Sequence, residues 1–144
     1  MNDYTCEIED PPGDATVEAT ANGLRAHDVE MAGEIPYESV GVVGRSEDGK
    51  TVGGLTGTIG GGWMYVHMMW VSPECRGRGL GSALLAAAEQ ETVRRGCPRV
   101  FLNTLSFQAP GFYERNGYTQ FAALEESPAP HSRIFFRKDL CTDA

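Results

Sequence analysis

The stretch VSPECRGRGLGS, residues Val71–Ser82, joins a strongly apolar segment to the clearest helical pattern in the chain. Three glycines and two arginines fall at this junction, and no aspartate stands among the first residues of the helical pattern. The first N–H groups of a helix have no intrahelical partner, and the helix dipole adds partial positive charge there. Glycine lets an oxygen approach the backbone closely, and arginine adds forked donors. The stretch therefore predicts an anion-binding turn suited to a pyrophosphate.

The segments on either side of the turn predict a strand and a helix. Trp63–Val71 is apolar throughout, which is typical of a central strand covered on both faces. From Gly79 to Arg95 the apolar residues recur with helical spacing, Gly96 fits the position after a helix, and Pro98 prevents its continuation. The apolar stripe of this helix comprises Leu80, Leu84, Ala87 and Ala88.

The chain before this unit predicts a helix and a meander of strands. A short strand is expected at Tyr4–Glu9, and a helix at Asp14–Ala26 with Asp14 as its N-cap and an apolar face of Val17, Ala21 and Leu24. His27–Pro36 is either a short second helix or a loop. Turn residues then separate the next two strands from each other and from the central one: Val40–Arg45, the turn Ser46–Lys50, Thr51–Ile59 and the hairpin turn Gly60–Gly62.

The chain after the helix predicts three more strands and a short helix. Arg99–Thr104 follows a crossover helix, so it should run parallel to the central strand. The remaining expected elements are a helix at Pro110–Asn116 and strands at Tyr118–Leu124 and Arg133–Asp139.

Bulk composition excludes several classes of protein. The 144 residues fit one domain, residues 1–144, and the net charge of −8 argues against general binding to nucleic acid or to an anionic membrane. Such acidity would favour encounter with cationic amines. No secretory signal or transmembrane stretch is visible, so we expect a cytoplasmic protein. The cysteines are far apart and form no CxxC pair, so reduced thiols are expected and no metal site: Cys6, Cys75, Cys97 and Cys141.

Two motifs in this element order resemble a known family. The glycine turn is similar to motif A of the GNAT superfamily of acyl-CoA-dependent N-acetyltransferases, with the family pattern falling on Arg76, Gly79 and Gly81. Phe112–Tyr118, FYERNGY, resembles the second family motif. The match covers about residues 14 to 139. One departure is Ser106, where many members of the family carry asparagine.

The resemblance implies an α+β fold and an acetyl-CoA site. The fold would be a mixed, twisted sheet of about six to seven strands with about four helices, and its parallel strand pair would splay at the cofactor. The pyrophosphate would lie on backbone N–H groups of the turn, and the pantetheine along the end of the apolar strand. The implied cofactor-binding residues are Met69, Val71, Arg76, Gly77, Arg78, Gly79, Leu80, Gly81, Ser82 and Ser106.

The resemblance places Tyr113 at the general-acid position of the family. A phenol stays protonated at neutral pH and can donate to a departing thiolate. A substrate ammonium must lose its proton before attack, and His67 is our candidate base because it lies inside the apolar strand. Strand alternation would put His67 on the face of Tyr65, Met69 and Val71. A hydrogen-bonded structural role for His67 remains an equal alternative.

The predicted activity is transfer of an acetyl group from acetyl-CoA to a small-molecule primary amine by direct attack in a ternary complex. Two alternatives stay open, namely a protein or peptide amine as the acceptor and a non-catalytic acyl-CoA-binding sensor. No nucleic-acid or membrane partner is expected, and a homodimer is left open. The segment Arg25–Tyr37, with Asp28, Glu30 and Glu34, would cover the acceptor in this family, but a solvated acidic loop is equally consistent with its composition.

Overall fold

The computed structural model describes residues 3–140, so Cys141 lies outside the described part of the chain. The chain divides into two compact units, Met1–Ile35 and Pro36–Ala144. Each unit is described by itself, and the single-domain organisation stays a prediction. None of the helices within residues 3–140 combines the length and the apolar character that crossing a membrane requires.

The first unit contains helix α1, Asp14–Ala32. The predicted helix was too short, because His27–Ala32 continue it, and Gly13 rather than Asp14 is its N-cap. The Glu9 carboxylate accepts hydrogen bonds from the Gly13 N–H at 2.8 Å and the Thr16 hydroxyl at 2.9 Å. The strand predicted at Tyr4–Glu9 is wrong, since these residues pair with no other strand. No α1 residue is buried, so the predicted apolar face of this helix is exposed.

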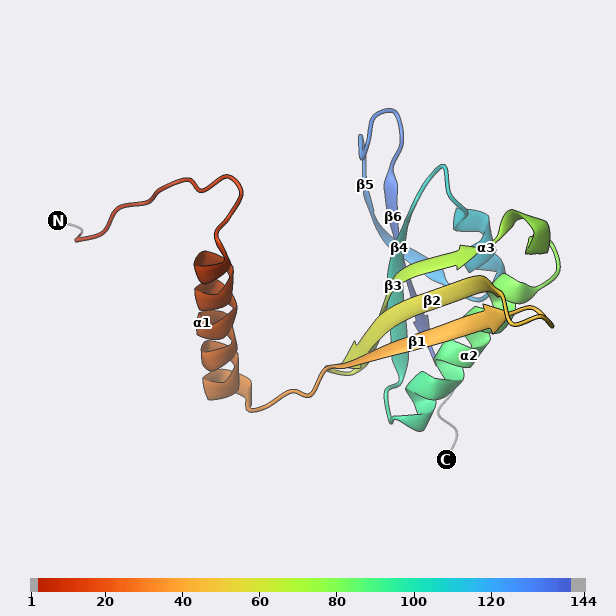
Figure 1. Ribbon diagram of the computed structural model, residues 1–144, viewed down its shortest axis with the longest axis horizontal. Helices are drawn as coiled ribbons and strands as arrows, with labels where there is room; N and C mark the ends of the chain where they lie inside the picture. The colour runs from red at the N-terminus through yellow and green to blue at the C-terminus, as the bar shows by residue number, and fades with distance from the viewer. Residues whose placement is uncertain (1–2, 141–144) are drawn as a thin grey trace. The chain divides into compact units, whose positions relative to one another are not determined.

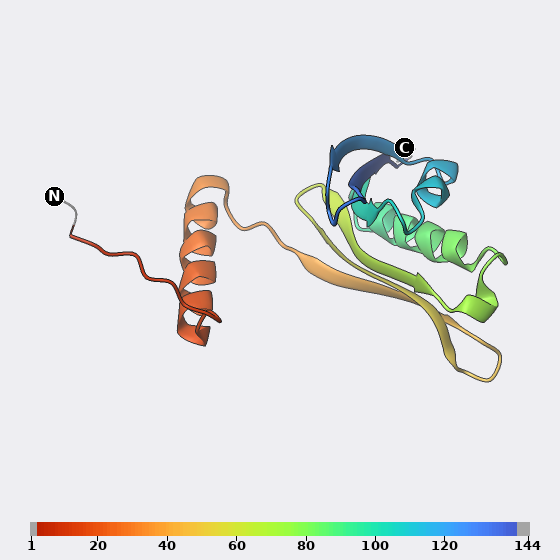
Figure 2. The same cartoon turned by 90° about the horizontal axis from the view of Figure 1, so that it is seen from above.

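The second unit is built on a mixed sheet (Figures 1 and 2). Within the described residues the sheet has six strands in the order β1-β2-β3-β4-β6-β5, and β3 and β4 are its parallel pair, as predicted. The elements of this unit are β1 (Glu38–Arg45), β2 (Thr51–Gly60), β3 (Trp63–Val71), the 3₁₀ turn η1 (Pro73–Cys75), α2 (Leu80–Arg94), β4 (Arg99–Leu105), α3 (Pro110–Arg115), β5 (Thr119–Leu124) and β6 (Arg133–Asp139).

Helix α2 covers one face of this sheet, and the core lies between them (Figure 2). Burying each large apolar side chain stabilises the fold by about 1.5–3 kcal/mol, which fixes the helix over the middle strands. We call the other side of the sheet the open face. Alternation along the strands and the strand register assign to it Trp63, Tyr65, Phe101, Asn103, Arg133, Phe135 and Arg137. The core residues are Leu55, Ile59, Met64, Val66, Leu84, Leu85, Ala88, Cys97, Val100, Leu102, Tyr113, Tyr118 and Phe136.

The parallel strands β3 and β4 separate after a short contact. Their register runs only from Met64 opposite Val100 to Val66 opposite Leu102, although both strands continue further. Figure 1 shows the two strands diverging beyond this contact. The splayed parallel pair predicted from the resemblance is therefore present.

A β-bulge at His67 changes which face the end of β3 presents. Thr56 pairs with Met68 and Gly57 pairs with Val66, so His67 has no partner in β2. A Cβ on Gly57 would lie 2.5 Å from the Tyr65 carbonyl oxygen, so this close approach requires glycine. A bulge shifts the alternation by one residue. As a result, the residues after His67 exchange faces relative to those before it.

The bulge corrects two predictions about β3. Met69 and Val71 pack against the core on the side of α2, whereas Tyr65 faces the open side, so the predicted shared face is wrong. The strand is also not covered on both sides throughout, because Met68 is 68% exposed and Trp70 is 50% exposed.

Candidate active site

The predicted anion turn lies between the end of β3 and the start of α2. The first backbone bond of α2 runs from the Ala83 N–H to the Gly79 carbonyl, at 3.0 Å. No side chain caps this helix, and its first turn contains no acidic residue. Within the described chain, the N–H groups of residues 77–82 donate to no carbonyl. The local geometry therefore supplies a row of free donors at the positive end of a helix dipole.

The turn requires the left-handed backbone conformation at two positions, and both are occupied by glycine. Gly77 has φ 76° and Gly79 has φ 86°, a region that side-chain-bearing residues rarely adopt. A Cβ at either position would have no heavy atom within 4 Å. The space that a side chain would occupy at these two positions is thus open. The residues present fit the pyrophosphate of a CoA molecule.

The two arginines of the turn differ in what they contact. Arg76 is already engaged, since its Nε donates to the Val71 carbonyl at 3.1 Å and its backbone N–H donates to the Pro73 carbonyl at 3.4 Å. Arg78 is exposed and forms no ion pair with a described residue. Arg78 is therefore the freer cation of the pair, and Arg76 also holds the turn against the end of β3.

Ser72, which the sequence reasoning missed, opens the turn. This residue is only 4% exposed, and its hydroxyl makes no hydrogen bond with any described residue. Its N–H donates to the Val52 carbonyl at 2.8 Å, which anchors the turn to β2. A buried hydroxyl without a partner is costly, so a ligand group or water at this position would satisfy it. The clue in the sequence was its place directly after the apolar strand.

Tyr113 lies on α3, which packs against the start of α2. A Cβ on Gly81 would lie 3.2 Å from the Phe112 ring and 3.7 Å from Cγ2 of Val71, so α3, α2 and β3 meet at this glycine. The Tyr113 ring is 8% exposed, and its hydroxyl has no hydrogen-bond partner among residues 3–140. Burial raises the pKa of this hydroxyl above the ordinary value for tyrosine. Tyr113 therefore keeps its proton and has no described acceptor for it.

A polar network around Tyr118 fixes the loop that follows α3. The Tyr118 hydroxyl donates to Oε2 of Glu89 at 2.8 Å, and the Lys138 ammonium donates to Oε1 of the same carboxylate at 2.9 Å. Burial, together with the adjacent Glu89 carboxylate, raises the pKa of Tyr118. The Tyr118 N–H also donates to the Tyr113 carbonyl at 3.0 Å. The Tyr118 hydroxyl therefore has a structural hydrogen bond, whereas the Tyr113 hydroxyl has no partner among the described residues.

The predicted base, His67, is exposed rather than buried. Its Nε2 lies 2.8 Å from the Thr58 hydroxyl, and its ring meets the Tyr65 ring edge-on at a centroid distance of 4.5 Å. Nδ1 has no hydrogen-bond partner among residues 3–140. The side chain lies at the point where β3 leaves β4, which is compatible with either a base or a structural role.

The remaining predicted cofactor residues fall in two groups. Leu80, Gly81 and Ser82 form the first turn of α2. The Ser106 side chain is engaged in a loop contact, because its hydroxyl accepts a hydrogen bond from the Ser132 N–H at 3.0 Å. The structure thus brings the turn residues together and leaves Ser106 in a contact between loops.

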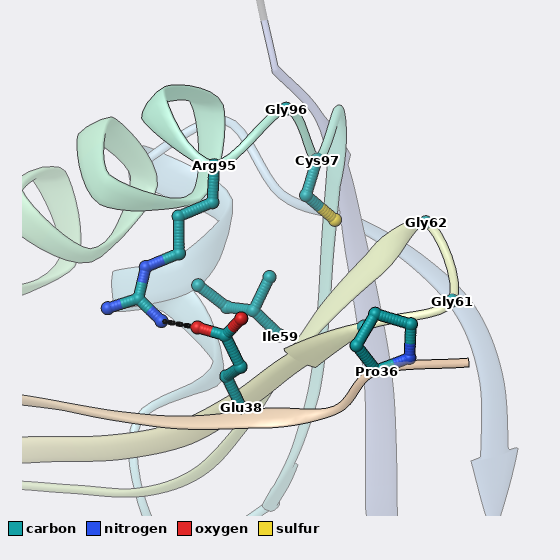
Figure 3. A pocket seen from close by; sticks show the side chains of 9 residues that line it. Pro36, Glu38, Ile59, Gly61, Gly62, Arg95, Gly96 and Cys97 are labelled. Carbon is teal, nitrogen blue, oxygen red and sulfur yellow. Dashed lines mark hydrogen bonds and ion pairs between the residues drawn. The ribbon is translucent and has the colours of Figure 1, made fainter. Parts of the chain in front are cut away.

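Two hollows lie away from the turn. One, of about 220 Å³, lies on the open face and is lined by Trp63, Phe101, Phe121 and Arg137. The other, of about 210 Å³, lies beyond the C-terminal end of α2, where Glu38 and Arg95 face one another as an ion pair (Figure 3). Its lining residues are Pro36, Glu38, Ile59, Gly60, Gly61, Gly62, Arg95, Gly96 and Cys97.

Among residues 3–140, no three histidine, cysteine, aspartate or glutamate side chains gather as metal ligands would. The described cysteines are free thiols, with Cys6 exposed, Cys75 half-buried and Cys97 buried.

Similar proteins agree with this geometry. The chain is 35% identical over 124 residues to an acetyltransferase of Agrobacterium fabrum, a match that covers 86% of this chain and 88% of that protein. It is 39% identical over 94 residues to blasticidin-S acetyltransferase of Streptomyces morookaense, covering 65% of this chain and 69% of the relative. The crystal structure of an acetyltransferase from Bacillus cereus superposes with a TM-score of 0.86 at 33% identity, covering 94% and 98% of the two chains.

The model of the acetyltransferase (GNAT) family matches residues 7–118, which include the glycine turn, the splayed strands and Tyr113. The α+β fold and the family predicted from the two motifs are thereby confirmed. The chain belongs to the acetyltransferase (GNAT) family.

Proposed function

We propose that this protein transfers the acetyl group of acetyl-CoA to a primary amine of a small molecule, by direct attack in a ternary complex. The observation that carries the proposal is the uncapped start of α2 directly beside the splayed ends of β3 and β4. Blasticidin-S acetyltransferase, by its name, acts on a small antibiotic, which supports a small-molecule acceptor here.

Acetyl-CoA would supply an acyl thioester, and the residues of the turn would hold its pyrophosphate. The N–H groups of residues 77–82, which bond no carbonyl of the described chain, would donate to the phosphate oxygens, and the Arg78 side chain would add a charged contact to them. Beyond Val66, the edge of β3 that faces β4 pairs with no strand of the described chain, and it is available to the pantetheine amides in the manner of an added strand. Backbone N–H groups near Met69–Val71 are the candidate donors for the developing oxyanion.

Tyr113 would donate the proton that the departing thiolate needs. Its hydroxyl has no competing partner among the described residues, and its raised pKa keeps the proton in place at neutral pH. His67 would accept the proton of the substrate amine through Nδ1 in the tautomer in which its Nε2–H donates to the Thr58 hydroxyl.

The test combines binding with turnover. Calorimetry should detect acetyl-CoA binding, and a panel of small amines should release free CoA thiol when added to the protein with acetyl-CoA. Tight binding without release from any amine would favour the acyl-CoA sensor instead. A protein that neither binds acetyl-CoA nor releases thiol would contradict the proposal as a whole.

A further inference from the structure

Three side chains form a hydrogen-bonded row across the open face of the sheet. Nδ2 of Asn103 on β4 donates to the Tyr65 hydroxyl on β3 at 3.1 Å, and Nη1 of Arg133 on β6 donates to Oδ1 of Asn103. All three residues are half-buried. The Tyr65 ring is also stacked on Phe101, with a centroid distance of 4.7 Å and an interplanar angle of 12°. Both polar atoms of the Asn103 amide are therefore hydrogen-bonded, Nδ2 to Tyr65 and Oδ1 to Arg133.

This row lies where the two parallel strands separate. Tyr65 pairs with Phe101 one position before the last paired residues, Val66 and Leu102, and Asn103 is the first β4 residue beyond them. The row also faces away from α2. An acceptor that approached the splay from the open face would meet these three side chains.

Unlike Arg99 and Arg137 on the same face, Arg133 forms no ion pair with a described carboxylate. Arg137 and Arg99 both lie near the Asp139 carboxylate, at 3.5 Å and 4.0 Å. No carboxylate within the described residues lies within 4.0 Å of Arg133. A guanidinium has five N–H donors, and the bond to Asn103 uses only one of them. The remaining donors form a planar fork, which matches a carboxylate better than any neutral group.

We propose that Arg133 binds a carboxylate of the acceptor, so that the substrate is an amine that also carries a carboxylate, as an amino acid does. Asn103 and Tyr65 are positioning residues, since they act on the substrate through the orientation of Arg133. This inference rests on the proposed acetyltransferase function and adds the acceptor class. An acceptor with a carboxylate differs from the purely cationic amines that the net charge of the chain would favour.

The experiment compares matched acceptors. Phenylalanine is paired with phenethylamine and lysine with cadaverine, each assayed with the whole protein by thiol release. The wild-type protein should prefer the carboxylate member by about tenfold or more in kcat/KM. Arg133→Gln should lower kcat/KM for the carboxylate members by about thirtyfold, leaving the other members and the acetyl-CoA affinity unchanged.

Two further variants test the role of position and charge. Asn103→Asp would place a carboxylate beside Arg133 and should remove the preference for the acidic acceptor, mainly through a higher KM with kcat retained. Arg137→Gln is the matched control on the same strand and face, and it should leave the preference intact.

Equal kcat/KM for both members of each pair in the wild-type protein would overturn the inference. An Arg133→Gln variant that loses activity equally with both members would overturn it as well. Thiol release separates these two results from failure of the proposed function. In both of them the wild-type protein still releases CoA thiol with the acceptors, whereas a protein that is not an acetyltransferase would release none with any amine, whether or not it binds acetyl-CoA.

Discussion

The two ends of α2 use similar backbone geometry for different purposes. Gly79 before the helix has φ 86° and Gly96 after it has φ 78°, and a Cβ on either would have no heavy atom within 4 Å. A helix leaves carbonyls unpaired at its C-terminal end, and two of them are used here. The Val93 carbonyl accepts from the Gly96 N–H at 2.8 Å, and the Thr92 carbonyl accepts from the Cys97 N–H at 3.0 Å. At the N-terminal end, the N–H groups of residues 77–82 have no acceptor among the residues that the structure describes.

Charged side chains sharpen the contrast. Beyond the C-terminal end, Arg95 bonds Glu91 at 2.6 Å and Glu38 at 3.1 Å, so its charge is neutralised within the protein (Figure 3). At the N-terminal end, Arg78 has no carboxylate partner among the described residues. A glycine and an arginine are therefore found at both ends of α2, and what distinguishes the proposed site is that its donors and its charge have no partner among the described residues.

The largest effect should come from a carboxylate placed in the turn. Gly79→Asp combines strain at positive φ with repulsion of the pyrophosphate, and loss of two charge-assisted hydrogen bonds lowers affinity roughly a thousandfold. Calorimetric titration with acetyl-CoA measures this change. Gly96→Asp carries the same backbone strain at the other end of α2 and should bind acetyl-CoA normally. Equal loss in both variants would remove the functional difference between the ends.

The next effect concerns the side chain that α3 brings to the N-terminal end. Tyr113→Phe should lower kcat by about a hundredfold with little change in the KM for acetyl-CoA, because it removes a general acid. Tyr118→Phe removes the hydroxyl that bonds Glu89, and it should lower thermal stability more than turnover. Steady-state kinetics and thermal melts on the two variants separate the roles. Unchanged kcat in Tyr113→Phe would assign that hydroxyl no part in the reaction.

Tyr113 also makes a prediction about alkaline pH. Its pKa is raised in the folded protein, so its neutral form is favoured by folding. The corresponding contribution to stability is complete below the unfolded value of about 10 and is lost as the pH rises beyond it. Denaturant melts between pH 9 and pH 11 should therefore show a steeper loss of stability in the wild type than in Tyr113→Phe. Parallel curves for the two proteins would contradict this assignment.

A smaller effect is expected from the arginine of the turn. Arg78→Ala should weaken acetyl-CoA binding by about tenfold, since one exposed charge-assisted contact is lost. The effect should shrink at high salt, because exposed charges are screened. Arg94→Ala, at the other end of α2, is the control and should not alter binding. If wild type and Arg78→Ala bind acetyl-CoA with equal affinity at low and at high salt, Arg78 does not contact the phosphates.

The smallest effect should be found at the C-terminal end itself. Hydrogen bonds from Arg94 and then Arg95 lower the pKa of Glu91 to about 2. Because this pKa is lowered on folding, the stabilisation is present above the unfolded value near 4.3 and is lost as the pH falls toward 2. Glu91→Gln should lower the Tm at neutral pH by about 2 °C, and this difference should vanish near pH 2. Acetyl-CoA affinity should stay unchanged.

Local signals in the chain were strong enough to predict the elements around the site. Glycine punctuation and apolar periodicity predicted β6 without error and α2 to within one residue at each end, because those patterns reflect local backbone preference. The errors arose where no local signal exists. The bulge at His67 depends on how closely Gly57 approaches the Tyr65 carbonyl, so alternation along β3 alone assigned the wrong partners to His67.

The sequence by itself predicted the glycine turn before α2 and the parallel strand pair, because glycine punctuation and a crossover helix are local signals. The role of Tyr113 was implied by the resemblance to the family and stays a proposal. Only the tertiary structure decided which groups are free. It showed that Arg76 is engaged with the Val71 carbonyl, that the Ser72 hydroxyl has no described partner, and that Asn103 orients Arg133. Availability for a ligand depends on contacts between residues distant in the sequence. Those contacts form only when the strands are brought together by burial of the core.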